Sequence, residues 1–430
     1  MERYSEYKDS GVQWIGEIPS HWDTRRVRYT GKSRNGLTYS PYDVNEDGEG
    51  TLVLRSSNIK EGKLTLDDNV FVKKEIPSDL MVKYGDILIC SRNGSRDLVG
   101  KLTLIDKDIK ASFGAFMMVY RTNMWAPFME NVLSVAIQSY KTLFSTSTIN
   151  QLTNDKFKNF VIPLPPLAEQ EKIVSYLKGK TSKIDAYVAE KEKEILLLQE
   201  LKQKTIADAV TKGLNPNVKM TDYSSLITSS HPNHWKILRN KTFLSLTGEK
   251  VGNRAKEFVL LSLTTKGIIV RDLESGKGKF PKDFDSYQFV RKGELVFCLF
   301  DIDETPRTVG LVDTEGMLTG AYTAFKVNPK IALPEYVYNF FLCVDNIKAL
   351  KPYYSGLRKT VRADKFLQIY IPLPPLSEQR AIVAYIEEKC QKIDTLMTEL
   401  QAEIDYMKEY KQRLIADCVT GQVNVQKETI

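Results

Sequence analysis

Loops that mix arginine or lysine with asparagine, glutamine and serine carry the side chains best suited to chemistry in this chain. Arginine binds guanine through two hydrogen bonds, asparagine and glutamine bind adenine in the same way, and lysine, serine and threonine contact phosphates. An ordinary polar loop has the same composition, but these loops recur at corresponding points in the two halves of the chain. The pattern predicts DNA contacts for Arg55, Asn58, Arg92, Asn93, Ser95, Arg96, Asn150 and Gln151, and for Lys266, Arg307, Arg358 and Lys359.

Motifs of common catalytic sites are missing or incomplete. Gly179-Lys180-Thr181 resembles the end of a phosphate-binding loop, but Val174 stands where that motif needs its first glycine. The sequence has no G-x-S-x-G, no H-E-x-x-H and no Asn/Asp-Pro-Pro-Tyr/Phe tetrapeptide of amino-methyltransferases. The acidic loop at Asp301 and Asp303 could hold a hard cation, although such loops are more often solvated. Recognition is therefore a better prediction than catalysis.

Composition sets the class of protein. The chain has 430 residues, 61 basic and 54 acidic side chains and a net charge of +7, which permits a nucleic-acid partner without requiring one. Five scattered cysteines without a C-x-x-C argue against disulfides and structural zinc. No apolar run approaches the roughly 18 residues of a membrane span, and the charged N-terminus lacks the features of a secretory signal. We therefore expect a cytoplasmic protein without membrane contact.

A duplicated segment organises the sequence. The segment Ile162–Gln170 recurs as Ile371–Gln379, 209 residues later, and the match continues without a gap to Ile206–Thr211 and Ile415–Thr420. This period is far longer than the roughly 20–50 residues of solenoid repeats. The chain therefore contains a domain and its following tail twice.

Each duplicated tail predicts a long helix. Prolines at positions 163, 165 and 166, and again at 372, 374 and 375, force extended backbone. Glu169 and Glu378 then fall in a first helical turn, where a carboxylate suits the dipole, and Gly213 and Gly421 follow about 40 residues later as caps. Apolar residues recur in heptads along both helices, so we expect an antiparallel coiled coil. The alternative is two solvated helices, each lying on its own domain.

The predicted fold class is α+β, with two pseudo-repeated mixed α/β domains separated by the two long helices. The domains are assigned to residues 1–160 and 216–369, and the helical repeats to residues 161–215 and 370–425. Helices within the domains are expected at 128–144 and 334–350. Strands are expected at the short apolar runs 51–54, 86–90, 116–120, 258–261 and 294–297.

The segment Tyr7–Trp22 resembles the opening of specificity subunits of type I restriction–modification systems. The segments that begin at Ile162 and Ile371 are similar to the proximal and distal repeats of that family, and residues 85–95 resemble the glycine-rich strand and loop of its target recognition domains. The resemblance extends to about Val425. The second half departs from the pattern, because Cys298–Asp301 replaces the Ser-Arg-Asn-Gly sequence.

The resemblance implies a role for each part of the chain. Each target recognition domain would read one half of a bipartite, asymmetric site in double-stranded DNA, and the helices would set the spacer. The chain would dock two DNA-methyltransferase subunits and, in the full complex, two restriction/translocase subunits. It would hold no cofactor itself, since S-adenosylmethionine, ATP and Mg are expected in the partner subunits.

Two other functions stay open at this point. A standalone nuclease using Asp301 and Asp303 would cut DNA alone with magnesium. A coiled-coil adaptor without a nucleic-acid role would show no duplex affinity even at low salt, where a DNA-binding protein binds most strongly.

Overall fold

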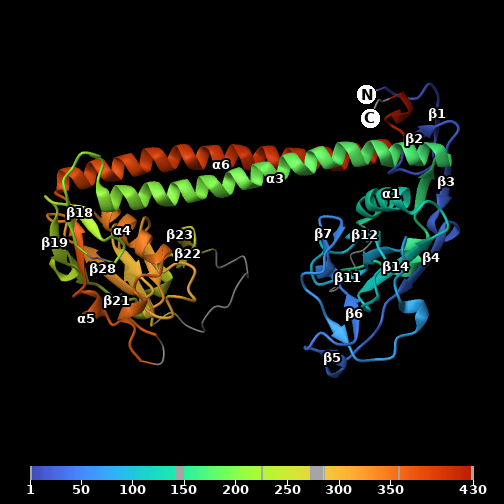
Figure 1. Cartoon of the computed structure of the whole chain (residues 1–430). Coiled ribbons are helices and arrows are strands. Elements are labelled where there is room, and N and C mark those ends of the chain that lie inside the picture. The colour runs from blue at the N-terminus through green and yellow to red at the C-terminus, as the bar shows by residue number, and fades with distance from the viewer. Residues whose placement is uncertain are drawn as a thin grey trace. The chain divides into compact units, whose positions relative to one another are not determined.

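The computed structural model describes residues 2–141, 150–223, 226–271, 284, 286–356 and 359–427. The chain divides into two compact units: unit 1 comprises Met1–Lys191 and Ala402–Ile430, and unit 2 comprises Glu192–Gln401. The long helices α3 (Leu167–Lys212) and α6 (Leu376–Val419) each begin in one unit and end in the other (Figure 1). The predicted boundaries place each long helix in a segment of its own, whereas the two units divide each helix between them. The two divisions follow different criteria, so the predicted domain limits stay a prediction.

The domain of unit 1 is built on two four-stranded sheets. The first is antiparallel throughout, in the order β12 (Leu102–Leu104), β10 (Ile87–Cys90), β14 (Met117–Thr122) and β4 (Gly31–Asn35). The second runs in the order β13 (Ala111–Phe113), β6 (Thr51–Leu54), β9 (Phe71–Val72) and β5 (Val44–Asn45), and β13 is parallel to β6. Every residue of β10 is buried, and Leu88 and Cys90 belong to the core that also contains Leu54 and Phe113 of the second sheet. The helix α1 (Ala126–Ser139) packs beside β12.

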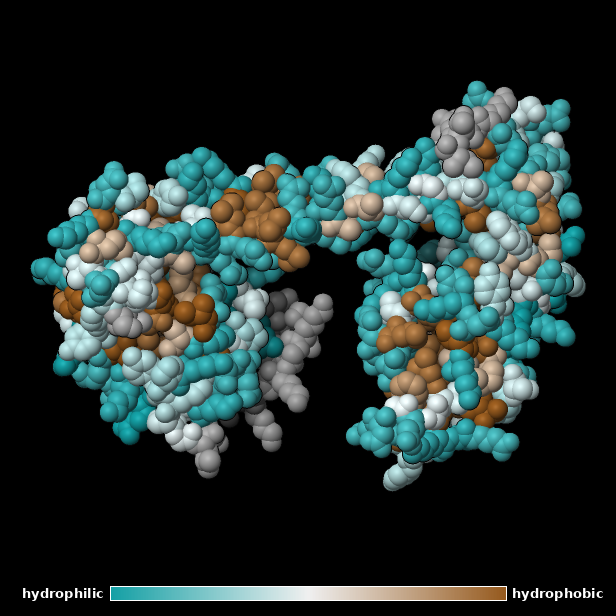
Figure 2. All heavy atoms as spheres, viewed as in Figure 1, coloured by the Kyte–Doolittle hydropathy of each residue, from teal (hydrophilic) through white to brown (hydrophobic). Residues whose placement is uncertain are grey.

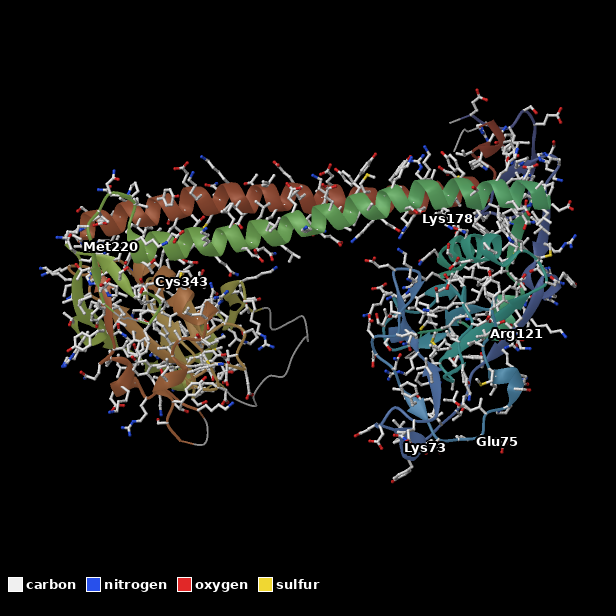
Figure 3. All side chains as sticks on the ribbon, viewed as in Figure 1. Lys73, Glu75, Arg121, Lys178, Met220 and Cys343 are labelled. Atoms are coloured by element: carbon white, nitrogen blue, oxygen red, sulfur yellow. The ribbon has the colours of Figure 1, made fainter. Side chains whose placement is uncertain are left out.

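Arg121, labelled in Figure 3, lies on β14 and connects the first sheet to the loop before β10. Its Nε donates to the buried carboxylate of Asp86 at 3.0 Å, and its Nη atoms donate to the carbonyl oxygens of Asp79 and Met81 at 3.0 and 2.6 Å. A carboxylate withdrawn from water needs such a paired charge. This ion pair is therefore part of the frame that holds the loops of unit 1.

The domain of unit 2 repeats the first sheet strand for strand. Its antiparallel order is β20 (Leu244–Leu246), β28 (Thr323–Val327), β25 (Leu295–Phe297) and β26 (Val309–Leu311), which correspond to β4, β14, β10 and β12. The helix α4 (Pro334–Asn346) packs on β26 as α1 packs on β12. The remaining strands form a three-stranded sheet of β21 (Glu249–Lys250), β24 (Gln288–Val290) and β27 (Gly316–Leu318), and a hairpin of β22 (Leu261–Thr264) and β23 (Gly267–Val270).

Short strand pairs frame each domain in the same way. In unit 1 these are β1 (Tyr7–Asp9) with β2 (Glu17–Pro19), and β3 (Asp23–Arg26) with β16 (Val161–Leu164). In unit 2 they are β17 (Met220–Asp222) with β18 (Ser230–Pro232), and β19 (Lys236–Arg239) with β29 (Tyr370–Leu373). The small helices α2 (Asn154–Lys158) and α5 (Ala363–Phe366) come directly before β16 and β29 in the chain. In unit 1, β7 (Ile59–Lys60) and β8 (Lys63–Leu64) also form a hairpin. The proline-rich segments thus form edge strands, where a missing N–H is tolerated.

The long helices pack antiparallel within each unit. In unit 1, Lys411 of α6 pairs with Asp185 of α3, and in unit 2 Lys202 of α3 pairs with Asp394 of α6 at 2.7 Å. Heptad residues turn inward, among them Ile184, Val188, Ile393, Leu400 and Ile404. The prediction of an α+β fold with two similar domains and an antiparallel coiled coil is confirmed, and the alternative of two separately solvated helices is wrong.

Several local predictions differ from the structure in their bounds. The helix expected at 128–144 runs from Ala126 to Ser139, and residues 142–144 lie outside the described residues. The expected strand at 258–261 begins only at Leu261, because the preceding Leu260 makes an isolated bridge to Met317 instead. The helix expected at 334–350 ends at Asn346, since Lys348 adopts a φ of 53° that helical backbone does not allow. No helix within the described ranges is long and apolar enough to cross a membrane.

Candidate nucleic-acid interface

Four of the predicted site residues meet on one short ladder in unit 1. The strand β11 (Arg92–Asn93) pairs antiparallel with β15 (Asn150–Gln151), so that Arg92 lies opposite Gln151 and Asn93 opposite Asn150. The backbone N–H of Leu152 extends the pairing by donating to the Ser91 carbonyl at 2.7 Å. Residues far apart in sequence are thereby held side by side directly after the buried strand β10.

A cavity of about 660 Å³ lies beside this ladder, and Arg55, Arg92, Asn93 and Phe116 are among the residues that line it. The Arg92 guanidinium carbon is 5.1 Å from the centroid of the Phe116 ring, and this ring is 59% exposed. The Asn93 amide donates to Ser56 Oγ at 3.3 Å. Stacking on a ring restricts the arginine while leaving its N–H groups available, so the cavity presents ordered donors.

The turn after β11 exposes two more predicted residues. The Ser95 backbone N–H donates to Asn93 Oδ1 at 3.0 Å, which fixes the turn. Ser95 and Arg96 are both exposed there. Their positions suit contact with a phosphate backbone.

Asn58 has a different place from the rest of the set. Its side chain is fully buried. Its Oδ1 accepts from the Arg55 backbone N–H at 2.9 Å, and its Nδ2 donates to the Thr65 and Asp68 carbonyl oxygens at 3.0 and 3.2 Å. Asn58 therefore shapes the loop that carries Arg55 and has no access to a base edge. Arg55 itself forms an ion pair with Asp68 at 2.8 Å.

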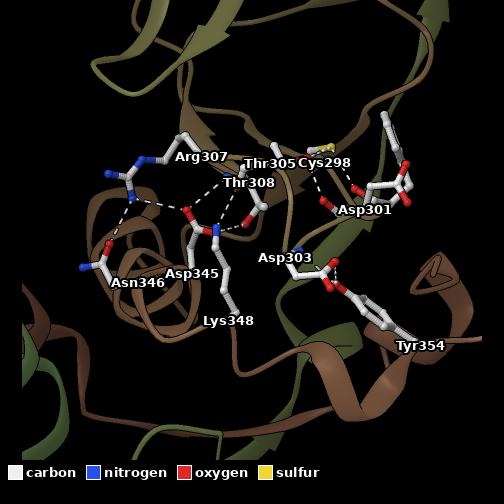
Figure 4. Close-up of polar contacts among 11 residues, drawn as sticks. Cys298, Asp301, Asp303, Thr305, Arg307, Thr308, Asp345, Asn346, Lys348 and Tyr354 are labelled. Atoms are coloured by element: carbon white, nitrogen blue, oxygen red, sulfur yellow. Dashed lines mark hydrogen bonds and ion pairs between the residues drawn. The ribbon is translucent and has the colours of Figure 1, made fainter. Parts of the chain in front are cut away.

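In unit 2, Arg307 belongs to a buried ion-pair network (Figure 4). The carboxylate of Asp345 is 2% exposed and accepts from Arg307 at 3.2 Å, from Lys348 at 2.7 Å and from the Thr308 hydroxyl at 2.6 Å. Breaking such a network leaves a buried charge without compensation. The geometry favours a structural role for Arg307.

Lys359 also has acidic partners. Its Nζ lies 3.2 Å from Asp303 and 3.3 Å from Glu304, and these hydrogen bonds raise the pKa of Lys359. Burial acts to raise the pKa of Asp303, but hydrogen bonds from Lys359 and Tyr354 outweigh it and the pKa is lowered. Asp303, one of the two acids considered for a nuclease site, is thus partly neutralised. The described part of the chain contains no group of three or more His, Cys, Asp or Glu that could hold a metal.

The other two predicted residues of unit 2 are Lys266 and Arg358. Lys266 is exposed at the turn between β22 and β23. Arg358 lies outside the described residues.

The sequence prediction missed the aromatic side chains. Phe116 follows Gly114-Ala115, and the same Gly-Ala-aromatic pattern recurs as Gly320-Ala321-Tyr322. The repetition was visible, but nothing in the sequence indicates that the ring lies under an arginine.

The prediction also missed what Glu169 and Glu378 do. His21 Nε2 lies 2.6 Å from Glu169 Oε1, and Trp22 Nε1 donates to Glu169 Oε2 at 3.0 Å. In unit 2 the same contacts join His234 and Trp235 to Glu378 at 2.7 and 3.1 Å. We call each set a His-Trp-Glu clamp, because it fastens the start of a domain to the start of its long helix.

Comparison with known proteins identifies similar chains. The model of the type I restriction modification DNA specificity domain matches residues 19–197 and 302–406. The chain is 24% identical to the EcoKI specificity subunit of Escherichia coli K12, over 96% of this chain and 91% of that protein. It is 25% identical to the putative MjaX specificity subunit of Methanocaldococcus jannaschii, over 96% of both chains.

A solved structure has the same fold. It comes from a study of complex assembly and conformational transition in the type I restriction–modification system. The TM-score is 0.68 at 15% identity, covering 94% of this chain and 99% of that one.

Proposed function

The chain belongs to the family of type I restriction–modification DNA specificity subunits, and on that premise we propose that each unit reads one half of a bipartite, asymmetric DNA site. A specificity subunit recognises DNA and is not itself an enzyme. The observation that carries the assignment of surfaces is the β11–β15 ladder, which collects Arg92, Asn93, Asn150 and Gln151 at one place. Such donors and acceptors discriminate base edges in the major groove.

We propose separate tasks for the site residues. In unit 1, Arg92, Asn93, Asn150 and Gln151 contact bases, while Arg55, Ser95 and Arg96 contact phosphates. In unit 2 the exposed Lys266, together with Lys359 and Arg358, supplies phosphate contacts. These assignments follow residue type and, for Ser95, Arg96, Lys266 and Lys359, also exposure.

The relatives are named as specificity subunits of type I restriction enzymes, which supports an assembly with methyltransferase and restriction subunits. We propose two subunits of each kind, with S-adenosylmethionine, ATP and Mg bound by them and not by this chain. The assembly would work in the cytoplasm.

Apolar side chains gather on the long helices (Figure 2). Leu197 and Leu201 of α3 are 55% and 50% exposed. The equivalent positions of α6, 209 residues later, carry the exposed aromatic residues Tyr406 and Tyr410. This repetition supports two similar docking surfaces.

The test is co-expression with the methyltransferase subunit of the same system, followed by mapping of methylated adenines across the genome. A bipartite asymmetric motif is expected. Duplex binding should fall steeply as salt rises, since phosphate contacts release counterions.

Arg92→Ala and Asn93→Ala are expected to weaken recognition of the first half-site alone, by about 1–3 kcal/mol if these residues touch bases. Arg26→Ala is the matched control, because Arg26 is an exposed arginine of β3 that does not line the cavity. A change confined to the second half-site would contradict the assignment of unit 1.

A further inference from the structure

Phe300 and Tyr322 of unit 2 occupy the places that Arg92 and Phe116 occupy in unit 1. The Cys90 thiol donates to the Arg92 carbonyl at 3.6 Å, and the Cys298 thiol donates to the Phe300 carbonyl at 3.4 Å. Cys90 ends the central strand β10, and Cys298 directly follows the central strand β25. Cys298 therefore corresponds to Cys90, so the segment that replaces Ser91–Gly94 begins at Leu299 and not, as predicted, at Cys298.

Two further contacts establish the correspondence. The Leu152 N–H donates to the Ser91 carbonyl at 2.7 Å, and the Val361 N–H, 209 residues later, donates to the Leu299 carbonyl at the same distance. The second residue of each pair, Phe116 or Tyr322, is aromatic and follows a Gly-Ala dipeptide directly before β14 or β28. Three independent features thus align the two sites.

The two pairs differ in chemistry. In unit 1 a cation lies over a ring, with Arg92 Cζ 5.1 Å from the Phe116 centroid. In unit 2 a ring lies over a ring, with the centroids of Phe300 and Tyr322 6.2 Å apart and their planes 18° from parallel. Both rings of unit 2 are partly exposed. Arginine offers two donors to guanine, whereas a phenyl ring offers an apolar surface that suits the methyl group of thymine.

We propose that the Phe300–Tyr322 pair recognises the 5-methyl group of a thymine in the second half-site, at the place equivalent to that of Arg92 in the first. This inference rests on the proposed function of the two units. Two of the acids that follow Phe300, Asp303 and Glu304, are paired with Lys359, whose Nζ lies 3.2 and 3.3 Å from them. Burial raises the pKa of Tyr322, so its hydroxyl stays protonated and can donate to a neighbouring phosphate.

The test replaces each thymine of the second half-site, one at a time, by deoxyuridine, which lacks only the methyl group. Binding of these duplexes to the complex with the methyltransferase subunit is then measured. One substitution is expected to weaken binding about fourfold, as for the loss of one buried methyl group. Phe300→Ala should bind the thymine and deoxyuridine duplexes equally at that position.

Two variants serve as controls. Arg92→Ala should retain the difference between thymine and deoxyuridine in the second half-site, and Tyr322→Phe should retain it because the ring remains. If Phe300→Ala fails to fold, Phe300→Asn replaces it with the same expectation. The inference is overturned if no thymine shows the difference in the wild-type complex, or if both Phe300 variants keep it. If the wild-type complex shows no sequence-specific binding to any duplex, the proposed function itself is overturned.

Discussion

A single carboxylate fastens each domain to its long helix. Glu169 accepts hydrogen bonds from Trp22 and from the Tyr4 hydroxyl at 3.0 Å each, and also contacts His21. Burial, followed by the Glu169 charge, raises the pKa of Tyr4, so this hydroxyl remains a donor. Glu378 has the corresponding histidine and tryptophan contacts in unit 2.

Glu169→Ala is expected to destabilise unit 1 by about 1–3 kcal/mol, because it removes the acceptor of partly buried donors. Glu378→Ala should destabilise unit 2 by a smaller amount within that range, since Glu169 has the additional Tyr4 bond. Calorimetry that follows the unfolding of each unit measures both effects. Equal losses, or a larger loss for Glu378→Ala, would show that the Tyr4 bond adds nothing.

Glu130 gives unit 1 a dependence on pH. Burial raises the pKa of this carboxyl to about 7, although its Oε1 accepts from the Leu104 N–H at 2.8 Å. The folded state therefore holds a proton more tightly than the unfolded chain. Its contribution to stability is fully present below the unfolded value near 4.5 and is lost as pH rises through about 7.

We therefore expect Glu130→Gln to reduce the fall in the unfolding free energy of unit 1 between pH 5 and 7.5. The slope attributable to one such group is at most about 1.4 kcal/mol per pH unit. Chemical denaturation across this range checks the slope, with Glu46→Gln, an exposed acid, as the control. Identical slopes in wild type and Glu130→Gln would contradict the assignment.

At the scale of elements, the long helices could be predicted and the sheets could not. Proline placement, heptads and capping glycines are local signals, and the helices end at Lys212 and Val419, directly before or close to Gly213 and Gly421. Strand order depends on pairings between distant segments. Nothing in the sequence of Ala111–Phe113 indicates that it pairs parallel with Thr51–Leu54.

The candidate site follows the same division. Residue type selected Arg92 and Gln151 as candidates, and the ladder places them opposite each other, but their contact with DNA stays a prediction. Residue type alone could not distinguish these candidates from Asn58 and Arg307. The Asn58 amide hydrogen-bonds to the backbone of its own loop, and Arg307 forms an ion pair with the buried Asp345. Burial and ion pairing come from tertiary structure, which a loop sequence does not contain.

The continuous helices lead to a prediction about the DNA spacer. Deleting one heptad from each helix, Glu192–Leu198 from α3 and Thr398–Ile404 from α6, keeps the apolar stripe in phase. Each helix becomes about 10 Å shorter, which corresponds to about three base pairs of B-DNA. Because the deletion also removes Leu197 of the proposed docking surface, the spacer is measured by binding to duplexes whose half-sites lie at different separations. Binding should be tightest at a shorter spacer, with both half-site sequences unchanged.

A second variant removes four residues from the middle of α3 alone. This deletion moves the apolar stripe of α3 out of phase with that of α6, so it should alter the spacer and also weaken the complex. An unchanged spacer after the paired deletion would rule out the helices as its determinant.

At the scale of the whole molecule, each unit needs the end of one helix and the beginning of the other. In unit 1 the Gly421 carbonyl accepts from the Tyr7 hydroxyl at 2.8 Å, and the Asn424 N–H donates to the Glu2 carbonyl at 2.9 Å. The N- and C-terminal segments therefore lie side by side (Figure 1). In unit 2 the corresponding place is taken by the end of α3, where Val210 accepts from the Tyr336 hydroxyl at 3.1 Å.

Because Ile206–Thr211 and Ile415–Thr420 have nearly the same sequence, the end of α3 should be able to replace the end of α6 against unit 1. Residues 1–219 expressed alone are then expected to form a homodimer, each copy supplying the helix end that the other lacks. Light scattering after gel filtration should give twice the mass of the fragment, and with the methyltransferase subunit the dimer should modify an inverted repeat of the first half-site. Val210→Asp, at a fully buried position, should yield monomers, whereas Lys204→Asp, at an exposed one, should not. A fragment that stays monomeric at micromolar concentration would mean that the two helix ends, despite their matching sequences, are not interchangeable.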